Sequence, residues 1–237
     1  MNETGCVETK MNLSQLDVIR DGFQKGLTLE QVALYADPAF DYIQMQVIRG
    51  GLEHGLTPEQ ISVFAKPEFE FNRMEEIREG FKKGLSMEQI SVFAKPEFDS
   101  YQMYQIRLGF EDGLAFERVF SYAKPIYSGA RMRILRLGIK SGLSEEQIAL
   151  YKNPELSEKQ AEFIYESLVK GHKKEYVQVF AKPEYDIFQM EEIRLGFEFG
   201  LTMEQVALYA KPEFTHEQMD KLRMGLHALA KKSLAVS

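Results

Sequence analysis

The stretch Ala94-Lys95-Pro96-Glu97-Phe98 decides the fold of this chain, because close copies of it return at a constant distance. The clearest copies are Ala65-Lys66-Pro67-Glu68-Phe69, Ala181-Lys182-Pro183-Glu184-Tyr185 and Ala210-Lys211-Pro212-Glu213-Phe214. Their prolines belong to a series with a spacing of 29 residues, namely Pro38, Pro67, Pro96, Pro125, Pro154, Pro183 and Pro212. A fixed period of about 20 to 50 residues predicts a stacked array of similar units.

Each unit begins with the signals of a helix. Asp99 is followed three residues later by Gln102, which is a capping-box pattern. Met103 and Ile106 then open an apolar face at helical spacing, and Gly113 suits the left-handed residue that ends a helix. These signals predict a first helix of about 13 residues. The same capping pairs recur as Asp41/Gln44, Ser157/Gln160, Asp186/Gln189 and Thr215/Gln218.

A shorter second helix is predicted directly after the glycine. Ser86 and Gln89 form another capping box, and Pro96 prevents the helix from continuing. Pro58 fits the same frame, because proline is accepted in the first position of a helix. This second helix has about 8 residues, judged from the distance between cap and proline. The matching caps are Thr28, Thr57, Ser144 and Thr202.

The predicted fold class is therefore all-α, an α-solenoid of tandem 29-residue helix-turn-helix repeats. We expect eight first helices and seven second helices, counted from the repeats in the sequence. One solenoid domain of about seven and a half units is expected over residues 11–232. Residues 1–10 are expected to be an irregular N-terminal segment, and residues 233–237 a C-terminal tail.

Three rows of residues recur with the units. We interpret all three as structural, since a row that repeats in almost every unit serves the array itself. The arginine row is expected to pair with Glu30, Glu59, Glu88, Glu117, Glu146, Glu175 and Glu204, or with helix C-terminal carbonyls. The glycine row indicates that a neighbouring helix lies against the backbone. The aromatic row is expected to pack in the core. The rows are Arg20, Arg49, Arg78, Arg107, Arg136, Arg194 and Arg223; Gly22, Gly51, Gly80, Gly109, Gly138, Gly196 and Gly225; and Tyr35, Phe64, Phe93, Tyr122, Tyr151, Phe180 and Tyr209.

Composition and charge restrict the class of protein. An apolar content of 44% is ordinary for a folded chain, and the net charge of −7 argues against broad nucleic-acid binding. Cys6 is the single cysteine, so no internal disulfide is expected. A chain with one cysteine suits a reducing cytoplasm. No apolar run suggests a signal peptide or a membrane span.

The pattern Ala-Lys-Pro-Glu-Phe-Asp, then Gln-Met-x-x-Ile-Arg-x-Gly-Phe, then Gly-Leu-Ser-x-Glu-Gln-Ile resembles tandem repeats in uncharacterised proteins of gut clostridia. Those proteins are often associated with phages or other mobile elements. The resemblance covers residues 11–232 and implies a bacterial cytoplasmic setting and a role in host–parasite conflict. It supplies no functional residues.

The first candidate for a partner-binding site is a basic window, because places where the units differ are the informative ones. Residues 118–143 carry six basic residues and no acidic one, whereas 11 basic and 20 acidic residues precede them and 12 and 16 follow, so the net charges are +6, −9 and −4. We expect replacement of Arg131, Arg133 and Lys140 to spare the fold. A solvated basic face is the alternative interpretation. The site residues in this window are Arg118, Arg131, Arg133, Arg136 and Lys140.

The second candidate is the next unit, which has lost the pattern. Tyr165 replaces the row arginine, Ser167 the row glycine and Ala161 the core methionine. Gly171-His172-Lys173-Lys174 replaces the helix cap, so the second helix is expected to fray. The changes in this unit indicate either a hinge or contact site, or sequence drift without a function. Its candidate partner-binding residues are Tyr165, His172, Lys173 and Lys174.

Catalytic patterns are missing from the sequence. The four histidines form no metal pair, and no P-loop, dinucleotide fingerprint or nucleophile elbow occurs. We therefore expect no enzyme, no cofactor and no metal. The leading hypothesis is a protein-binding scaffold of a mobile element that blocks a host defence nuclease, such as an anti-CRISPR protein, and binds the nuclease or its nucleic-acid complex. The alternative is a nucleic-acid-binding solenoid that uses the basic window.

Overall fold

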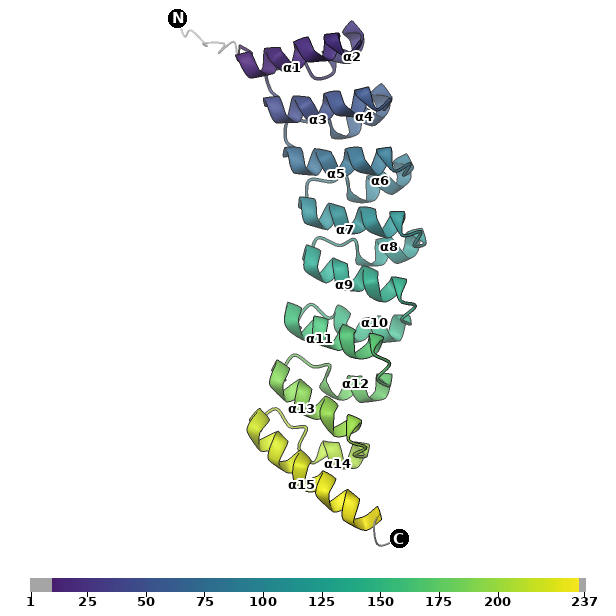
Figure 1. Ribbon diagram of the computed structural model, residues 1–237, viewed down its shortest axis with the longest axis vertical. Coiled ribbons are helices and arrows are strands. Elements are labelled where there is room, and N and C mark those ends of the chain that lie inside the picture. The colour runs from purple at the N-terminus through teal and green to yellow at the C-terminus, as the bar shows by residue number, and fades with distance from the viewer. Residues whose placement is uncertain (1–9, 235–237) are drawn as a thin grey trace, which may run out of the picture. The chain divides into compact units, whose positions relative to one another are not determined.

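The computed structural model describes residues 10–234, and within them all regular structure is helical. Fifteen helices occur in this range, eight long and seven short in alternation, as the sequence predicted (Figure 1). The chain divides into two compact units between Met132 and Arg133, inside helix α9 (Gly129–Lys140). A single repeat domain over residues 11–232 thus stays a prediction.

The first unit holds four complete repeats. Its long helices have twelve residues each and its short ones five or seven, close to the predicted lengths. Long helices begin 29 residues apart, at Leu13, Tyr42, Phe71 and Ser100. The helices are α1 (Leu13–Gln24), α2 (Leu29–Ala33), α3 (Tyr42–Glu53), α4 (Pro58–Phe64), α5 (Phe71–Lys82), α6 (Met87–Phe93), α7 (Ser100–Glu111) and α8 (Phe116–Tyr122).

The second unit continues the period. Its long helices have twelve residues, except α15, which has 19. After α9 the helices are α10 (Glu145–Lys152), α11 (Glu158–Val169), α12 (Lys174–Phe180), α13 (Ile187–Glu198), α14 (Met203–Ala207) and α15 (His216–Leu234).

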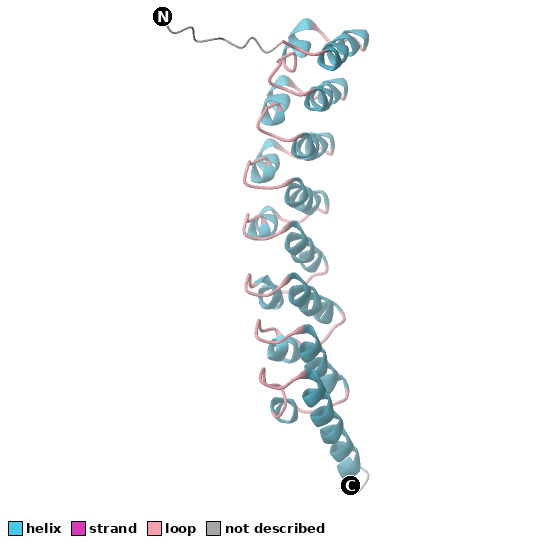
Figure 2. Cartoon of the chain, turned by 90° about the vertical axis from the view of Figure 1, so that its left-hand side faces the viewer, coloured by secondary structure: helices cyan, strands magenta, loops and turns pink. Residues whose placement is uncertain are grey.

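Long and short helices form two layers within each unit (Figure 2). Long helices pack on the next long helix, as α3 does on α5 and α13 on α15. Short helices pack on their own long helix and on the following one, as α6 does on α5 and α7. This stacking is the arrangement expected of an α-solenoid.

The predicted capping boxes are present. The Asp99 carboxylate accepts a hydrogen bond from the Gln102 backbone N–H at 2.7 Å, and the Gln102 side chain accepts one from the Asp99 N–H at 2.8 Å. Gly113 ends α7 with a φ of 76°, as predicted. Short helices are capped in the same way, for example by Ser86 with Gln89.

The capping glutamine has a second role that the sequence pattern did not show. Its side-chain amide also donates across the repeat to the proline turn that ends it: from Gln102 to the carbonyls of Pro125 at 3.3 Å and Tyr127 at 2.7 Å. Gln15, Gln44, Gln160 and Gln189 donate in the same way. In two repeats an arginine, Arg73 or Arg131, occupies this position, and Arg73 donates to the Pro96 carbonyl at 3.1 Å. This row of glutamine and arginine side chains therefore connects the long helix of a repeat to the start of the next repeat.

The glycine row makes room for the aromatic row, which confirms that a helix lies against the backbone there. A Cβ at Gly109 would lie 2.0 Å from the hydroxyl oxygen of Tyr122, and one at Gly51 would lie 3.2 Å from the Phe64 ring. The helix in question is the repeat's own short helix. The aromatic side chains are 0–1% exposed, so their core role is also confirmed.

Six members of the arginine row, all except Arg136, are seen to pair with carboxylates other than the predicted ones. Arg107 bonds Glu76 of the preceding long helix at 2.9 Å and also pairs with Glu111 of its own helix. Arg49, Arg78, Arg194 and Arg223 likewise use carboxylates of the long helices. The expected partners lie at the starts of the short helices. There the Thr57 hydroxyl and the backbone hydrogen-bond Glu59 and lower its pKa.

Candidate partner-binding site

The five basic residues of the predicted window are not gathered into one exposed stripe. Arg118 lies on α8 and Arg131 on the first turn of α9, both in the first unit, whereas Arg133, Arg136 and Lys140 belong to the second unit. Arg131 is only 3% exposed and Arg136 8%, while Arg118 and Arg133 are half-buried and Lys140 is exposed.

The burial of Arg131 corrects the expectation that its replacement would spare the fold. Arg131 stands 29 residues after Gln102 and 58 after Arg73, in the row that donates to proline turns. A charged group that is 97% buried cannot be exchanged for glutamate without leaving a desolvated charge. Arg136, in turn, belongs to the structural arginine row. The repeat therefore already accounts for two of the five residues.

In the second unit, Arg133 forms an ion pair with Glu162 of α11. The side chains are 37% and 47% exposed, so the pair contributes little to stability in water. Arg133 and Lys140 are seven residues apart on α9, which places them on one side of the helix. The accessible part of the basic window is thus small.

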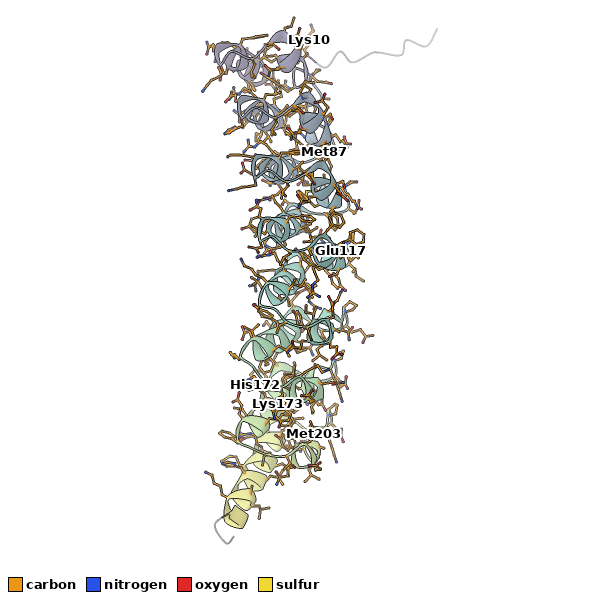
Figure 3. The ribbon with its side chains drawn as sticks, turned by 90° about the vertical axis from the view of Figure 1, so that its right-hand side faces the viewer. Lys10, Met87, Glu117, His172, Lys173 and Met203 are labelled. Carbon is orange, nitrogen blue, oxygen red and sulfur yellow. The ribbon has the colours of Figure 1, made fainter. Side chains whose placement is uncertain are left out.

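The repeat with the lost pattern, formed by α11 and α12, makes contacts with the repeats on either side of it. Lys173 precedes α12 and makes no side-chain capping bond, as predicted, and its ammonium lies 5.4 Å from the centre of the Tyr176 ring. Its neighbour His172 is labelled beside it in Figure 3, and the His172 Nε2 lies 3.2 Å from a carboxylate oxygen of Glu198. Lys174 pairs with Glu146 at the start of the preceding short helix.

Aromatic contacts add to these links. The Tyr176 ring stacks on Phe197 of α13 with centroids 4.2 Å apart, and Tyr165 packs on Tyr151 at 5.9 Å. Helix α12 has seven residues, like α6 and α8, so the missing cap has not shortened it. Fraying of this helix stays a prediction. All four candidate residues of this unit make contacts inside the chain.

A different surface, in the first unit, presents side chains that the sequence analysis did not single out. It lies over α3, α5 and α7 and consists of Ile43, Phe71, Tyr101 and Tyr104 with Glu75 and Glu76, and we call it the aromatic–acidic face. Phe71 is 39% exposed, Tyr101 46% and Tyr104 36%. The two tyrosine rings are stacked, with centroids 6.2 Å apart.

Two hollows open on this face. One, of about 400 Å³, lies between α3 and α5 and is lined by Ile43, Phe71 and Glu75, among others. The other, of about 210 Å³, lies between α5 and α7 and is lined by Glu75, Tyr101 and Tyr104, among others. Glu75 therefore borders both hollows. Rings around paired hollows provide the rigid apolar contact area found in protein interfaces.

The electrostatics of the face are acidic. Glu75 and Glu79 share Arg78, and Glu76 and Glu111 share Arg107, so four carboxylates surround two guanidinium groups. One carboxylate oxygen of Glu75 bonds Arg78 at 2.9 Å, and the other accepts no hydrogen bond. Burial raises the pKa of Glu76 despite the bond from Arg107.

The sequence held a signal for this face. Tyr104 stands where the other units have Asp17, Gln46, Glu75, Arg133, Glu162, Glu191 and Asp220, which are all polar. An aromatic residue at an outward position differs from the common repeat pattern as clearly as a change of charge does. The Tyr101 ring also lies close to the backbone of the next repeat, because a Cβ at Gly129 would lie 2.2 Å from it.

Comparison with known proteins adds no function. No family model, curated protein or solved structure matches the chain significantly. Among residues 10–234, no group of three or more histidine, cysteine and acidic side chains is arranged to hold a metal ion. Cys6 lies outside the described residues. In the same range, no helix combines the length and hydropathy that a membrane crossing requires.

Proposed function

We propose that this chain is a non-enzymatic scaffold that binds a protein partner, and that the aromatic–acidic face of the first unit is its contact surface. The observation that carries the proposal is the cluster of Phe71, Tyr101 and Tyr104 around two hollows on outward positions of the repeat. Aromatic side chains exposed in this way are enriched at the centres of protein interfaces.

The charge of the surroundings specifies the partner further. Residues 1–117 carry 11 basic and 20 acidic residues, a net charge of −9. On the face itself carboxylates outnumber guanidinium groups, and the Glu75 side chain is 43% exposed. A partner with lysine or arginine side chains around an apolar centre would complement this surface and be attracted to it over a distance.

Nucleases fit that description, because the grooves that hold nucleic acid are basic. An inhibitor with an acidic face could compete with nucleic acid for such a groove. The resemblance to mobile-element proteins favours a host defence nuclease, including a CRISPR effector, in a bacterial cytoplasm. We therefore propose inhibition of such a nuclease as the specific role.

Direct binding of nucleic acid is the alternative, and the structure favours it less. It depended on a basic stripe, and Arg131 and Arg136 of that stripe are buried. Arg133 pairs with Glu162, which removes a further charge from a phosphate-binding surface.

Capture from a bacterial lysate, with and without nuclease treatment, separates these functions. A protein scaffold retains its partner after nucleic acid is digested. Its captured partner should be released only gradually by salt, whereas a complex with DNA or RNA weakens steeply with salt. Loss of all captured material on nuclease treatment would favour the alternative and contradict the proposal.

A further inference from the structure

Helix α15 differs from the other long helices in how it ends. Seven turn glycines with positive φ follow the long helices of the preceding repeats, the last of them Gly200. At the corresponding position, 29 residues after Gly200, the sequence has Leu229. The helix accordingly runs on to Leu234, and no short helix folds back on it within the described residues.

The face that a short helix covers in other repeats is open on α15. Leu222 corresponds to Ile193 of α13, but Leu222 is 43% exposed whereas Ile193 is 0% exposed. Gly225 corresponds to Gly196, where a Cβ would lie 1.9 Å from the Tyr209 hydroxyl. A Cβ at Gly225 would meet nothing within 4 Å. Glycine inside a helix costs about 1 kcal/mol relative to alanine. Among residues 10–234, no atom fills the space at Gly225.

The preceding repeat shows what such a face accommodates. Helix α14 lies on α13 with Val206 buried and with the ring of Tyr209 reaching the glycine of the long helix. The Tyr209 hydroxyl donates to the Glu192 carbonyl at 3.1 Å. The occupant is thus a short helix with an aliphatic residue three positions before an aromatic one.

We infer that Leu222, Gly225 and Leu226 form a docking socket for an amphipathic helix of a partner protein, and we call this surface the α15 socket. The interface continues the one between α13 and α14, with the aromatic ring of the occupant over Gly225. Lys221 borders the socket, one residue before Leu222 and four before Gly225, and is exposed. Lys221 corresponds to Glu192 of α13, which lies beside the end of α14, where the Tyr209 hydroxyl bonds its carbonyl. We therefore expect the occupant to carry an acidic residue near its aromatic end. This site is separate from the aromatic–acidic face.

Binding of a peptide tests the socket in the full chain. The probe is a fluorescent peptide with the sequence of residues 200–214, which contains the α14 segment, followed by polarisation. Saturable binding to the wild-type chain is expected. The Gly225→Leu variant should bind at least about tenfold more weakly, because leucine fills the space for the ring. Its thermal midpoint should be unchanged or higher, since nothing lies near Gly225 and leucine favours helix.

Two controls make the result specific. Met224→Gln changes an exposed side chain that lines the opposite hollow with Leu195 and Phe199, and should leave binding unchanged. A peptide with alanine in place of Tyr209 should bind about tenfold more weakly. Absence of saturable binding, or equal binding by Gly225→Leu, overturns the inference. Sedimentation tests whether the chain forms a dimer that the Gly225→Leu change dissociates. In that case the occupant of the socket is a second copy of the chain, and the inference of a partner protein's helix is wrong.

Discussion

Two regions depart from the common repeat pattern: the repeat formed by α11 and α12, and the face over α5 and α7. They differ in whether the changed side chains make contacts inside the chain or stay exposed. In the first, the Ser167 hydroxyl bonds a carbonyl of its own helix, and Lys174 and the Tyr176 ring contact neighbouring repeats. In the second, Tyr101 and Tyr104 stay exposed beside Glu75. Departure from a repeat is therefore a signal of binding only where the departing side chains remain available.

The changes around α12 also form a matched set. Four of the short-helix aromatics are tyrosines, and each of them lies over a glycine, as Tyr209 does over Gly196. Ser167 replaces that glycine where the aromatic residue is Phe180, which has no hydroxyl. The serine hydroxyl turns back to the Phe163 carbonyl at 2.8 Å. The serine side chain therefore occupies a position where the hydroxyl of a tyrosine would collide with a Cβ.

The largest effect on stability is expected at the support of the exposed face. Arg107→Ala removes the guanidinium that bonds Glu76 and leaves that half-buried carboxylate without its cation. The free energy of unfolding at neutral pH should fall by about 2–3 kcal/mol. Urea titration followed by circular dichroism measures the change.

The pH dependence of that variant has a definite sign. Burial raises the pKa of Glu76 in the folded chain, and loss of Arg107 removes a group that lowers it. A carboxyl group with a raised folded pKa binds protons more tightly when folded, so acid stabilises the fold. The deficit of the variant should shrink as pH falls from about 7 to about 5. A deficit that is constant over this range would show that the charge of Glu76 is not its cause.

A smaller effect is expected where the two repeats differ in core packing. Phe180→Tyr adds a hydroxyl against Ser167, and should cost about 1–3 kcal/mol by overpacking. The double change Phe180→Tyr with Ser167→Gly restores the common pair and should recover most of the loss. Equal unfolding midpoints for the single and double variants would contradict the matched-set interpretation.

The smallest effect concerns the lost cap. Lys173→Ser supplies an oxygen that can accept from the N–H groups at the start of α12, and should raise stability by about 0.5–1 kcal/mol. Hydrogen exchange of the α12 amides provides a local readout, and slower exchange is expected. Unchanged exchange would show that the contacts of His172 and Lys174 already hold the helix.

Much of this fold could be predicted because its signals are local. Caps such as Asp99 with Gln102, turn glycines such as Gly113 and the proline period fix helix starts and ends within a few residues. Partners between repeats were harder to predict. The bond from Gln102 to Tyr127 and the pairing of Arg107 with Glu76 join residues 25 and 31 positions apart, and they depend on how helices stack.

The exposure of the candidate site residues was also hard to predict from the sequence. Charge alone selected Arg131 and Arg136, although position in the repeat places both in the interior. The exposed rings at Tyr101 and Tyr104 carry no charge, so a search by charge passed over them. Comparing each outward position across all units would have found Tyr104.

The most direct measurement of the central claim compares partner binding by three forms of the full chain. Tyr101→Ala with Tyr104→Ala removes the rings of the aromatic–acidic face. Phe188→Ala is the matched control, because Phe188 occupies on α13 the position of Tyr101 on α7 and is 65% exposed. Affinity for the captured protein should fall at least about tenfold in the double variant, which corresponds to about 1.4 kcal/mol, and should stay unchanged in the control. Undiminished binding by a folded double variant would contradict the account.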